Sequence, residues 1–281
     1  MGRYSFNKRL FLPMCAHPKI DPISGELFAD QSPPPLLLGE PGQEEEPRFR
    51  RSQIRGHPSH PDRGISWIDV PDWTSFHYIN AWEEGTDKIV VLSSSITPVE
   101  HLFDDIAGLS NRLHEIHLDL RSGWSWKQHV CSAGLDFGQI NQKFLRRKNR
   151  YVYMCYYGPW PKISGLAKVD LDAPRLPKVV IDGTSDPDLN EPCLVASRRF
   201  ERGQFCGKPF FVVNGKEEDD GCVLSYIHDE ESGVSELLVM DAKSPTLETV
   251  ASIELPARVP YGFHGIFINA DQIANQNHAT L

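Results

Sequence analysis

The stretch Cys-Val-Leu-Ser-Tyr-Ile-His (222–228) is followed by the polar turn Asp-Glu-Glu-Ser-Gly (229–233) and by Ser-Glu-Leu-Leu-Val-Met (235–240). Two apolar runs of strand length that are joined by a short glycine-containing turn are typical of a β-hairpin. Similar runs recur along the chain, whereas helical periodicity is weak. Many short strands at such spacing predict an all-β sandwich, barrel or propeller, and the residue pattern alone does not choose between them.

The same pattern locates the other strands that we expect. They lie at 65–70, 88–93, 113–120, 150–157, 165–171, 209–213 and 249–255. A further turn is expected at 120–123, and short helices only at 99–108 and 271–276.

Residues 30–64 differ in composition from the rest of the chain. Pro33-Pro34-Pro35, Glu44-Glu45-Glu46 and the Arg-rich run 48–55 offer little apolar surface for burial. We therefore expect an irregular or disordered connector at 30–64, between a strand segment at 1–29 and a strand-rich body at 65–268. Residues 269–281 are expected to form a C-terminal tail.

Composition excludes several classes of function. The 281 residues carry a net charge of −9 without a basic stripe, which argues against nucleic acid as a partner. The six cysteines include no Cys-x-x-Cys pair, so reduced thiols are expected and a zinc ribbon is not. No apolar run approaches the roughly 20 residues that span a bilayer, and no signal or transit peptide is recognisable.

Three histidines have unusual neighbours. His17 lies in Ala-His-Pro-Lys-Ile, His77 in Ser-Phe-His-Tyr-Ile, and His264 in Gly-Phe-His-Gly-Ile. An imidazole among aromatic and apolar residues is expected to be buried, and each buried ring nitrogen needs a partner. A metal ion on one nitrogen and a hydrogen-bond acceptor on the other would satisfy both. The alternative is that each is a core histidine bonded to backbone carbonyl oxygens.

Five segments of the chain closely resemble the plant carotenoid cleavage dioxygenases, and most closely the plastid branch with the nine-cis-epoxycarotenoid dioxygenases and the type-four cleavage enzymes. They are His-Pro-Lys-Ile-Asp-Pro-Ile-Ser-Gly-Glu-Leu-Phe (17–28), Phe-His-Tyr-Ile-Asn-Ala-Trp-Glu-Glu (76–84), Pro-Trp-Pro-Lys-Ile-Ser-Gly (159–165), Glu-Asp-Asp-Gly with Tyr-Ile-His-Asp-Glu (218–230), and Leu-Pro-Ala-Arg-Val-Pro-Tyr-Gly-Phe-His-Gly (255–265). The resemblance runs from residue 1 to about 268, apart from the connector.

The resemblance implies a seven-bladed β-propeller with Fe(II) on its axis, held by four histidines. In that family the enzyme adds dioxygen across one conjugated double bond of a carotenoid and gives two carbonyl products, with peripheral membrane contact and a plastid location. His17, His77 and His264 match three of the four ligand positions. Asp136 matches a carboxylate that accepts a hydrogen bond from a ligand histidine, although an ordinary edge-strand or turn aspartate is the alternative.

The chain departs from the family pattern at three places. The strand that carries the second ligand histidine is missing, and His57 and His60 in the connector fit exposed loop positions better than that role. Lys208 stands where the family has another carboxylate, and a cation cannot accept the hydrogen bond expected there. The family's N-terminal half is absent, so we expect a partial propeller of roughly four blades.

Two functions follow from this comparison of motifs. The first is Fe(II)-dependent oxidative cleavage of a carotenoid. The second is a catalytically inactive, shortened carotenoid-oxygenase chain that binds carotenoid or nothing. An unrelated β-sandwich binding module would require the five motifs to coincide by chance. The acidic run Glu217-Glu218-Asp219-Asp220 is interpreted as a surface turn in either case.

Overall fold

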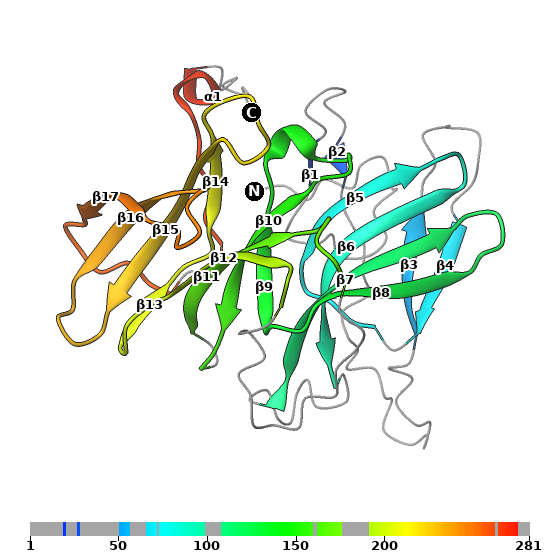
Figure 1. The fold of residues 1–281 in the computed structure, drawn as a ribbon, viewed down its shortest axis with the longest axis horizontal. Helices are drawn as coiled ribbons and strands as arrows, with labels where there is room; N and C mark the ends of the chain where they lie inside the picture. The colour runs from blue at the N-terminus through cyan, green and yellow to red at the C-terminus, as the bar shows by residue number, and fades with distance from the viewer. Residues whose placement is uncertain are drawn as a thin grey trace, which may run out of the picture. The chain divides into compact units, whose positions relative to one another are not determined.

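The computed structural model describes residues 19–20, 27–28, 51–56, 66–71, 73–98, 108–159, 162–175, 191–261 and 264–274. Nearly all of its regular elements are strands (Figure 1). The chain forms two compact units. Unit 1 comprises Met1–Ala133 and Gln142–Asn149, and unit 2 comprises Gly134–Asn141 and Arg150–Leu281.

Unit 1 contains a four-stranded antiparallel sheet in the order of the chain. Its strands are β5 (Tyr78–Glu84), β6 (Lys88–Thr97), β7 (Ser110–Asp119) and β8 (Ser125–Cys131). Each strand pairs with the next one along the sequence, so the sheet is a meander. In the predicted turn between β7 and β8, the Asp119 carboxylate accepts two backbone N–H bonds, which confirms that prediction.

A small apolar core covers one face of this sheet. Val91, Ile116 and Leu118 project from β6 and β7 and pack with apolar side chains of the preceding segment. Those partners are Ile68, Val70 and Trp73. Ile116 and Leu118 are completely buried. Burial of one such side chain contributes about 1.5–3 kcal/mol, so this cluster holds the preceding segment against the meander.

The connector predicted at 30–64 is not irregular throughout. Strand β3 (Arg51–Gly56) lies inside it and pairs antiparallel with β4 (Ser66–Pro71) from Arg51–Pro71 to Gly56–Ser66. A strand needs no apolar side chains when its backbone groups are paired and it has only one neighbour. The polar composition of 51–56 was therefore a poor guide. Strands β1 (Lys19–Ile20) and β2 (Leu27–Phe28) form a second short pair.

Unit 2 is built from two antiparallel sheets. The first contains β9 (Leu135–Gln139), β10 (Tyr151–Tyr157), β11 (Ile163–Asp170) and β12 (Leu194–Arg199), again in chain order. Its β9 and β12 are the edge strands. The strand predicted at 165–171 corresponds to β11, whereas β9 and β12 were not predicted.

The second sheet of unit 2 is centred on the hairpin that the sequence predicts at 222–240. Strands β15 (Gly221–Asp229) and β16 (Ser235–Asp241) pair from Cys222–Asp241 to His228–Ser235. On one side β17 (Thr249–Glu254) pairs with β16. On the other, β13 (Gln204–Cys206) and β14 (Phe210–Val213) both pair with β15.

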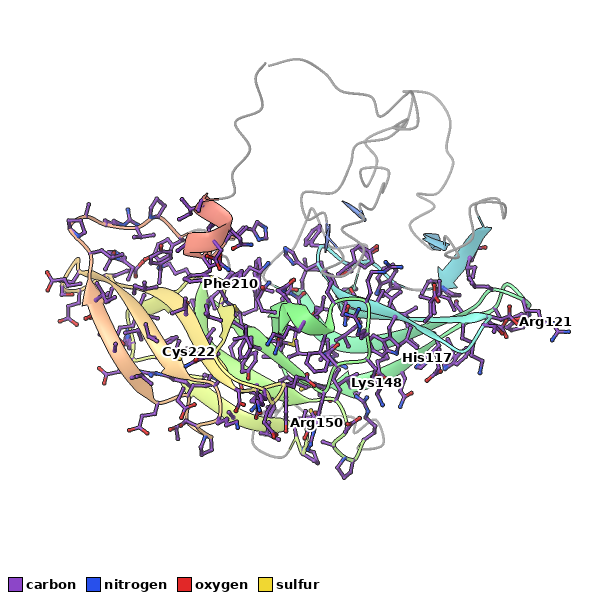
Figure 2. All side chains as sticks on the ribbon, turned by 90° about the horizontal axis from the view of Figure 1, so that it is seen from above. His117, Arg121, Lys148, Arg150, Phe210 and Cys222 are labelled. Atoms are coloured by element: carbon purple, nitrogen blue, oxygen red, sulfur yellow. The ribbon has the colours of Figure 1, made fainter. Side chains whose placement is uncertain are left out.

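The core of unit 2 lies between these two sheets. The rings of Tyr153 on β10 and Phe211 on β14 are stacked with their centroids 5.0 Å apart. Around them pack further buried side chains, among them Phe137, Cys155, Leu166, Cys206, Val223 and Met240. Figure 2 labels Phe210 and Cys222, which lie on the paired strands β14 and β15 of this unit.

The all-β prediction is confirmed for the residues that the structure describes, and every sheet among them is open. The only α-helix in these ranges, α1 (Ala270–Ala274), overlaps the helix predicted at 271–276. The helix predicted at 99–108 falls almost entirely outside the described residues. No helix in the described ranges is long and apolar enough to cross a membrane.

Candidate metal centre

The three histidines predicted as metal ligands fall into three different parts of the chain. His77 belongs to unit 1 and His264 to unit 2. His17 lies outside the described residues, as do His57 and His60. His77 and His264 therefore have separate surroundings, each within its own unit.

His77 stands immediately before β5 and is half-buried. Its carbonyl oxygen accepts a hydrogen bond from the Ser93 hydroxyl at 3.0 Å, and its N–H donates to Ser75 Oγ at 3.2 Å. The two serine oxygens are 2.6 Å apart, so they form one hydrogen-bonded unit. The backbone at His77 is thus fixed to the middle of β6. A fixed position of this kind helps an imidazole to present a nitrogen to a metal ion.

Asn80, three residues later in the same motif, anchors β5. Its side chain is buried, and its amide nitrogen donates to the carbonyl oxygens of Phe144 and Arg147 at 3.1 and 2.8 Å. Its amide oxygen accepts from the N–H of Arg146 at 3.0 Å. These bonds satisfy buried polar groups of the segment 142–149 and hold it against β5.

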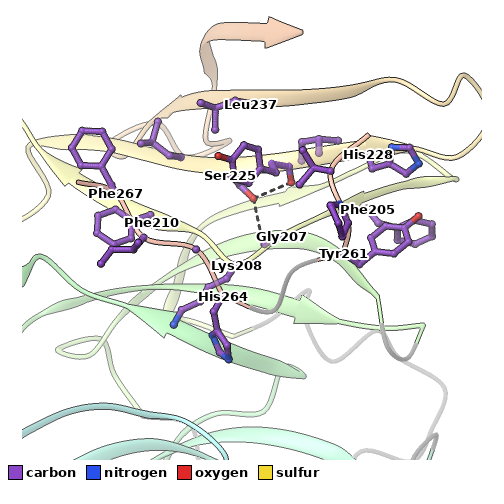
Figure 3. A pocket seen from close by; sticks show the side chains of 17 residues that line it. Phe205, Gly207, Lys208, Phe210, Ser225, His228, Leu237, Tyr261, His264 and Phe267 are labelled. Carbon is purple, nitrogen blue, oxygen red and sulfur yellow. Dashed lines mark hydrogen bonds between the residues drawn. The ribbon is translucent and has the colours of Figure 1, made fainter. Parts of the chain in front are cut away.

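His264 follows β17 in the chain and lines a pocket of about 280 Å³ in unit 2 (Figure 3). His264 is solvent-exposed, whereas its aromatic neighbours in the sequence predicted a buried imidazole. Its ring lies 5.8 Å from the ring of Phe137, centroid to centroid, at a tilt of 60°. Apart from Lys208 and a few other polar groups, the pocket is lined by aromatic and aliphatic side chains of β13–β15 and of the segment that carries His264.

Asp136 is buried although β9 is an edge strand. Its carboxylate accepts the N–H of Phe137 at 2.7 Å, and Phe137 has a φ of +57°, which is a strained conformation for an aromatic residue. Because Phe137 also contacts His264, the strained residue links the carboxylate strand to the predicted ligand. Asp136 is thus a buried carboxylate beside the residue whose ring contacts the imidazole.

Lys208 lines the same pocket as His264, and Figure 3 shows the two side chains pointing to the same side. Its charge also acts on the core thiol of Cys155, which lies opposite Asp136 in the β9–β10 register. Burial raises the pKa of Cys155 well above its usual value. A hydrogen bond with Cys206 and the Asp136 carboxylate add to this rise, whereas Lys208 lowers the pKa. Lys208 and Asp136 therefore bring opposite charges to one region of unit 2.

These residues fit a bound divalent metal ion in part. Imidazole nitrogens are suitable ligands for iron. A buried carboxylate nearby can accept a hydrogen bond from the other ring nitrogen of a ligand histidine. The Lys208 ammonium does not fit that role, because it has no acceptor and repels a cation.

Unit 1 also contains a histidine pair that was not predicted. The rings of His114 on β7 and His129 on β8 meet edge to face with centroids 5.2 Å apart. Nδ1 of His114 lies 2.9 Å from Ser95 Oγ and 2.9 Å from the carbonyl oxygen of Arg112. Burial lowers the pKa of His114 to about 4. Three consecutive serines in the apolar run 88–97 were the available signal, because buried hydroxyls need polar partners on the neighbouring strand.

The acidic run 217–220 is also more than a surface turn. The Glu218 carboxylate accepts the N–H groups of Arg150 and Tyr151 at 2.8 and 2.7 Å, and burial raises its pKa. Asp219 pairs with the buried ammonium of Lys168 at 2.7 Å. These contacts could not be predicted from the sequence, because the partners lie 51 to 68 residues away.

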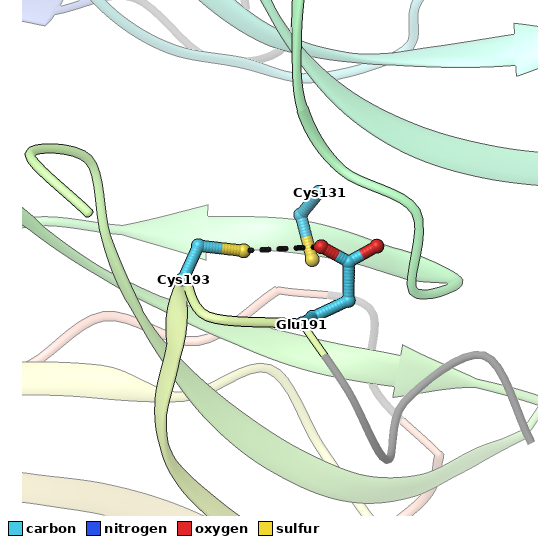
Figure 4. Close-up of side chains that lie close together, drawn as sticks. All are labelled: Cys131, Glu191 and Cys193. Carbon is cyan, nitrogen blue, oxygen red and sulfur yellow. Dashed lines mark hydrogen bonds between the residues drawn. The ribbon is translucent and has the colours of Figure 1, made fainter. Parts of the chain in front are cut away.

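A buried thiol of unit 2 has a carboxylate partner. The Sγ of Cys193 donates to the Glu191 carboxylate at 3.7 Å (Figure 4). Within unit 2 these two groups offer two donor atoms, fewer than a protein metal site uses. None of the five described cysteines forms a disulfide bond, in agreement with the reduced thiols predicted from the sequence.

The chain was compared with protein families, curated proteins and solved structures. The family model of RPE65, the retinal pigment epithelial membrane protein, matches residues 49–269. Among curated proteins, the chain is 39% identical over 76% of its length to the chromoplastic zeaxanthin 7,8(7',8')-cleavage dioxygenase of Crocus sativus. It is 33% identical over 98% of its length to the chloroplastic 9-cis-epoxycarotenoid dioxygenase NCED1 of Oryza sativa subsp. japonica.

The chain spans about half the length of these relatives, 56% of the crocus protein and 50% of the rice protein. The alignment with the rice protein runs over 336 positions, although the chain has only 281 residues. At least 55 positions of that alignment, the difference between the two lengths, therefore face gaps in this chain.

The solved structures give the same family. A variant of Synechocystis apocarotenoid oxygenase is 26% identical with a TM-score of 0.62, and the match covers 77% of this chain and 44% of that one. A cobalt-substituted Synechocystis apocarotenoid oxygenase, 22% identical, has the same fold, with a TM-score of 0.69 over 95% of this chain and 67% of that one. The chain therefore belongs to the RPE65 family of carotenoid oxygenases and has their fold.

Proposed function

We propose that this protein catalyses the oxidative cleavage of a carotenoid double bond by dioxygen, with Fe(II) held by His17, His77 and His264. The observation that carries the proposal is the family match over 49–269, which includes the segments of His77 and His264. The named activities of the crocus and rice relatives support the same substrate class. One C=C bond and one O₂ give two C=O groups, so no further oxidant or reductant is needed.

The residues of the chain have separate tasks in this proposal. The three imidazoles would hold Fe(II), which supplies binding and activation of dioxygen. Asp136 and Phe137 orient His264, because the carboxylate fixes the Phe137 N–H and the Phe137 ring contacts the imidazole. The apolar lining of the pocket beside His264 excludes water from a polyene.

We also propose a partial seven-bladed propeller. The β5–β8, β9–β12 and β13–β17 sheets each have the antiparallel form of a propeller blade, and β3–β4 would belong to a fourth. A plastid location is proposed because the rice and crocus relatives are named chloroplastic and chromoplastic. Peripheral contact with a membrane, where carotenoids dissolve, belongs to the same proposal.

The test is cleavage of a detergent-solubilised carotenoid by the purified, Fe(II)-supplied protein under ¹⁸O₂. The expected result is two carbonyl fragments that each carry one ¹⁸O atom, and no such products from the His264→Ala variant. Absence of any apocarotenoid product from the wild type would contradict the activity.

A second candidate function is a catalytically inactive carotenoid-oxygenase chain, and Lys208 in the pocket favours it. The Lys208→Glu variant separates the two candidates. If Lys208 alone blocks the site, this variant forms products and the wild type does not. If both are inactive but a carotenoid still co-purifies, the chain only binds carotenoid.

A further inference from the structure

The chain that follows β17 turns back over the sheet of unit 2 and carries His264. We call the described residues 255–261 and 264–267 the return segment. Its first residue, Leu255, donates its N–H to the carbonyl oxygen of Ser235 at 2.8 Å. The N–H of Val259 donates to the side-chain oxygen of the same serine at 3.1 Å, and that oxygen lies 2.9 Å from Nδ1 of the buried His228. The start of the return segment is thereby fixed to the β15–β16 hairpin.

Tyr261 attaches the return segment a second time. Its hydroxyl donates to Oε1 of Glu230 at 2.6 Å, and the Lys162 ammonium lies 2.5 Å from the same oxygen. Glu230 therefore receives two bonds, one from the return segment and one from the start of β11. The Lys162 and Tyr261 bonds lower the pKa of Glu230, so the carboxylate is charged at neutral pH.

The ring of Tyr261 is also enclosed. Phe205 and His228 meet it edge to face, with centroids 6.2 and 5.8 Å away. The Arg258 guanidinium stands 5.4 Å from the ring centroid. Ring contacts and a bonded hydroxyl together restrain a phenol, so Tyr261 is suited to hold the return segment in place.

His264 lies between this attachment and another. Beyond it, Phe267 packs on Phe210 with centroids 6.1 Å apart. Figure 3 shows Tyr261 at one end of the pocket, Phe267 at the other, and His264 between them. His264 itself is exposed, and its ring lies 5.8 Å from the Phe137 ring, centroid to centroid. Its placement therefore depends on how the return segment is held.

We propose that Glu230 and Tyr261 are positioning residues for His264, through a hydroxyl–carboxylate bond that fixes the return segment over the β13–β17 sheet. The inference rests on the proposed function in one respect, namely that His264 serves as a metal ligand. It assigns a role to the Tyr-Ile-His-Asp-Glu motif (226–230), which the ligand set leaves unexplained. A salt bridge between exposed side chains alone would contribute little, and the added phenol bond makes the contact directional.

Three variants test the inference. Tyr261→Phe removes one hydroxyl and keeps the ring packing, and Glu230→Gln removes the charge on the other side of the same bond. The matched control is Glu236→Gln on β16, a carboxylate that accepts only an exposed bond from Ser252 among the described contacts. Glu230→Gln also removes the charge that pairs with Lys162. We therefore expect it to have at least the effect of Tyr261→Phe, and the double variant to be no worse than Glu230→Gln alone.

The first measurement is the NMR spectrum of the His264 ring protons, assigned by their loss in His264→Ala. Both variants should shift or broaden these signals, and Glu236→Gln should leave them unchanged. A merely structural role would lower the unfolding temperature without changing the native-state ring signals. Unchanged His264 signals in both variants would overturn the inference, whether or not the protein takes up metal.

The second measurement is trypsin cleavage after Arg258 in the return segment, with cleavage after the exposed Arg202 as internal reference. Loss of a hydrogen bond to a charged group should increase the Arg258 rate relative to Arg202 roughly tenfold. An equal rise at both sites would indicate global unfolding and would contradict a local attachment.

Metal binding is measured in a separate experiment. The affinity for Co(II) is determined from the visible absorption of the bound ion. Weaker Co(II) binding in both variants, with unchanged affinity in Glu236→Gln, supports the inference. Equal Co(II) affinity in all proteins overturns it. If the wild type binds no Co(II) or Fe(II), the proposed function fails, while the His264 ring signals still decide the positioning of the residue.

Discussion

The ammonium group of Lys168 lies 2.7 Å from a carboxylate oxygen of Asp219, and both side chains are largely buried in unit 2. The same ammonium donates to the carbonyl oxygen of Ala242 at 3.0 Å and stands 4.1 Å from the ring centroid of Tyr151. A buried charge is tolerated when it is paired and fully hydrogen-bonded. This pair fixes the acidic turn 217–220 against β11.

Replacing Lys168 by Met should therefore be costly. The variant leaves the Asp219 carboxylate buried without its main partner, and about 3–5 kcal/mol of unfolding free energy should be lost. Urea unfolding measures this. Lys243→Met is the control, because Lys243 pairs with Asp220 while its own side chain is 48% exposed. Solvent screens that exposed pair, so its loss should cost far less than the loss of Lys168. Equal losses in the two variants would contradict the burial argument.

Asn80→Asp should destabilise unit 1. The carboxylate cannot donate, so the carbonyl oxygens of Phe144 and Arg147 lose their partner and face a negative charge. Each buried group left without a partner costs about 1–3 kcal/mol. Thermal unfolding of the full chain measures the loss, and Asn214→Asp in an exposed turn serves as the control. A melting temperature that changes as little as in the control would show that these bonds contribute nothing.

Stability should decrease on mild acidification because of His114. Its pKa is about 4 in the folded protein and about 6.5 in the unfolded chain, so the unfolded state binds the proton first. The stabilisation is complete above pH 6.5 and is lost as the pH falls toward 4. Between pH 7.5 and 5.5 the expected loss is about 1 kcal/mol. Unfolding in urea at several pH values should show this difference between wild type and His114→Gln. If the unfolding free energies of the two proteins changed with pH in parallel, a group other than His114 would cause the effect.

Thiol reactivity should follow burial. Cys155 is completely buried, and burial raises its pKa well above the usual value, so little thiolate forms. Cys222 is the one described cysteine that is half-buried rather than buried. Alkylation of the native protein, read by mass spectrometry, should modify Cys222 well before Cys155. Early labelling of Cys155 would mean that the core between the two sheets of unit 2 opens readily.

Much of the fold could be predicted from the sequence, because β15 and β16 are long enough to show alternation and their turn contains glycine. Strand β9 was missed because Asp136 and Gly138 are typical of turns, and burial between sheets overrides that preference. Strand β3 was missed because five of its six residues are not apolar, and a strand with one neighbour can form without an apolar face.

The candidate site was predicted less completely. His77, His264 and Asp136 were predicted from motifs. Motifs identify candidate site residues, but they do not show which other residues fix these side chains in place. Asn80 could not be recognised as an anchor, because its acceptors lie 64 and 67 residues further along the chain. Glu230 and Tyr261 are 31 residues apart in the sequence. Their hydrogen bond could not be predicted, because the two side chains meet only when the return segment folds back.

The most direct test of the central claim is X-ray absorption at the iron K-edge of the purified protein loaded with Fe(II). Shared ligation by His17, His77 and His264 predicts about one iron per chain with three imidazole nitrogens at roughly 2 Å. Each single His→Ala variant should then lose one imidazole or release the metal. Iron that keeps all its imidazole scatterers in His264→Ala, or no iron bound by the wild type, would contradict the claim.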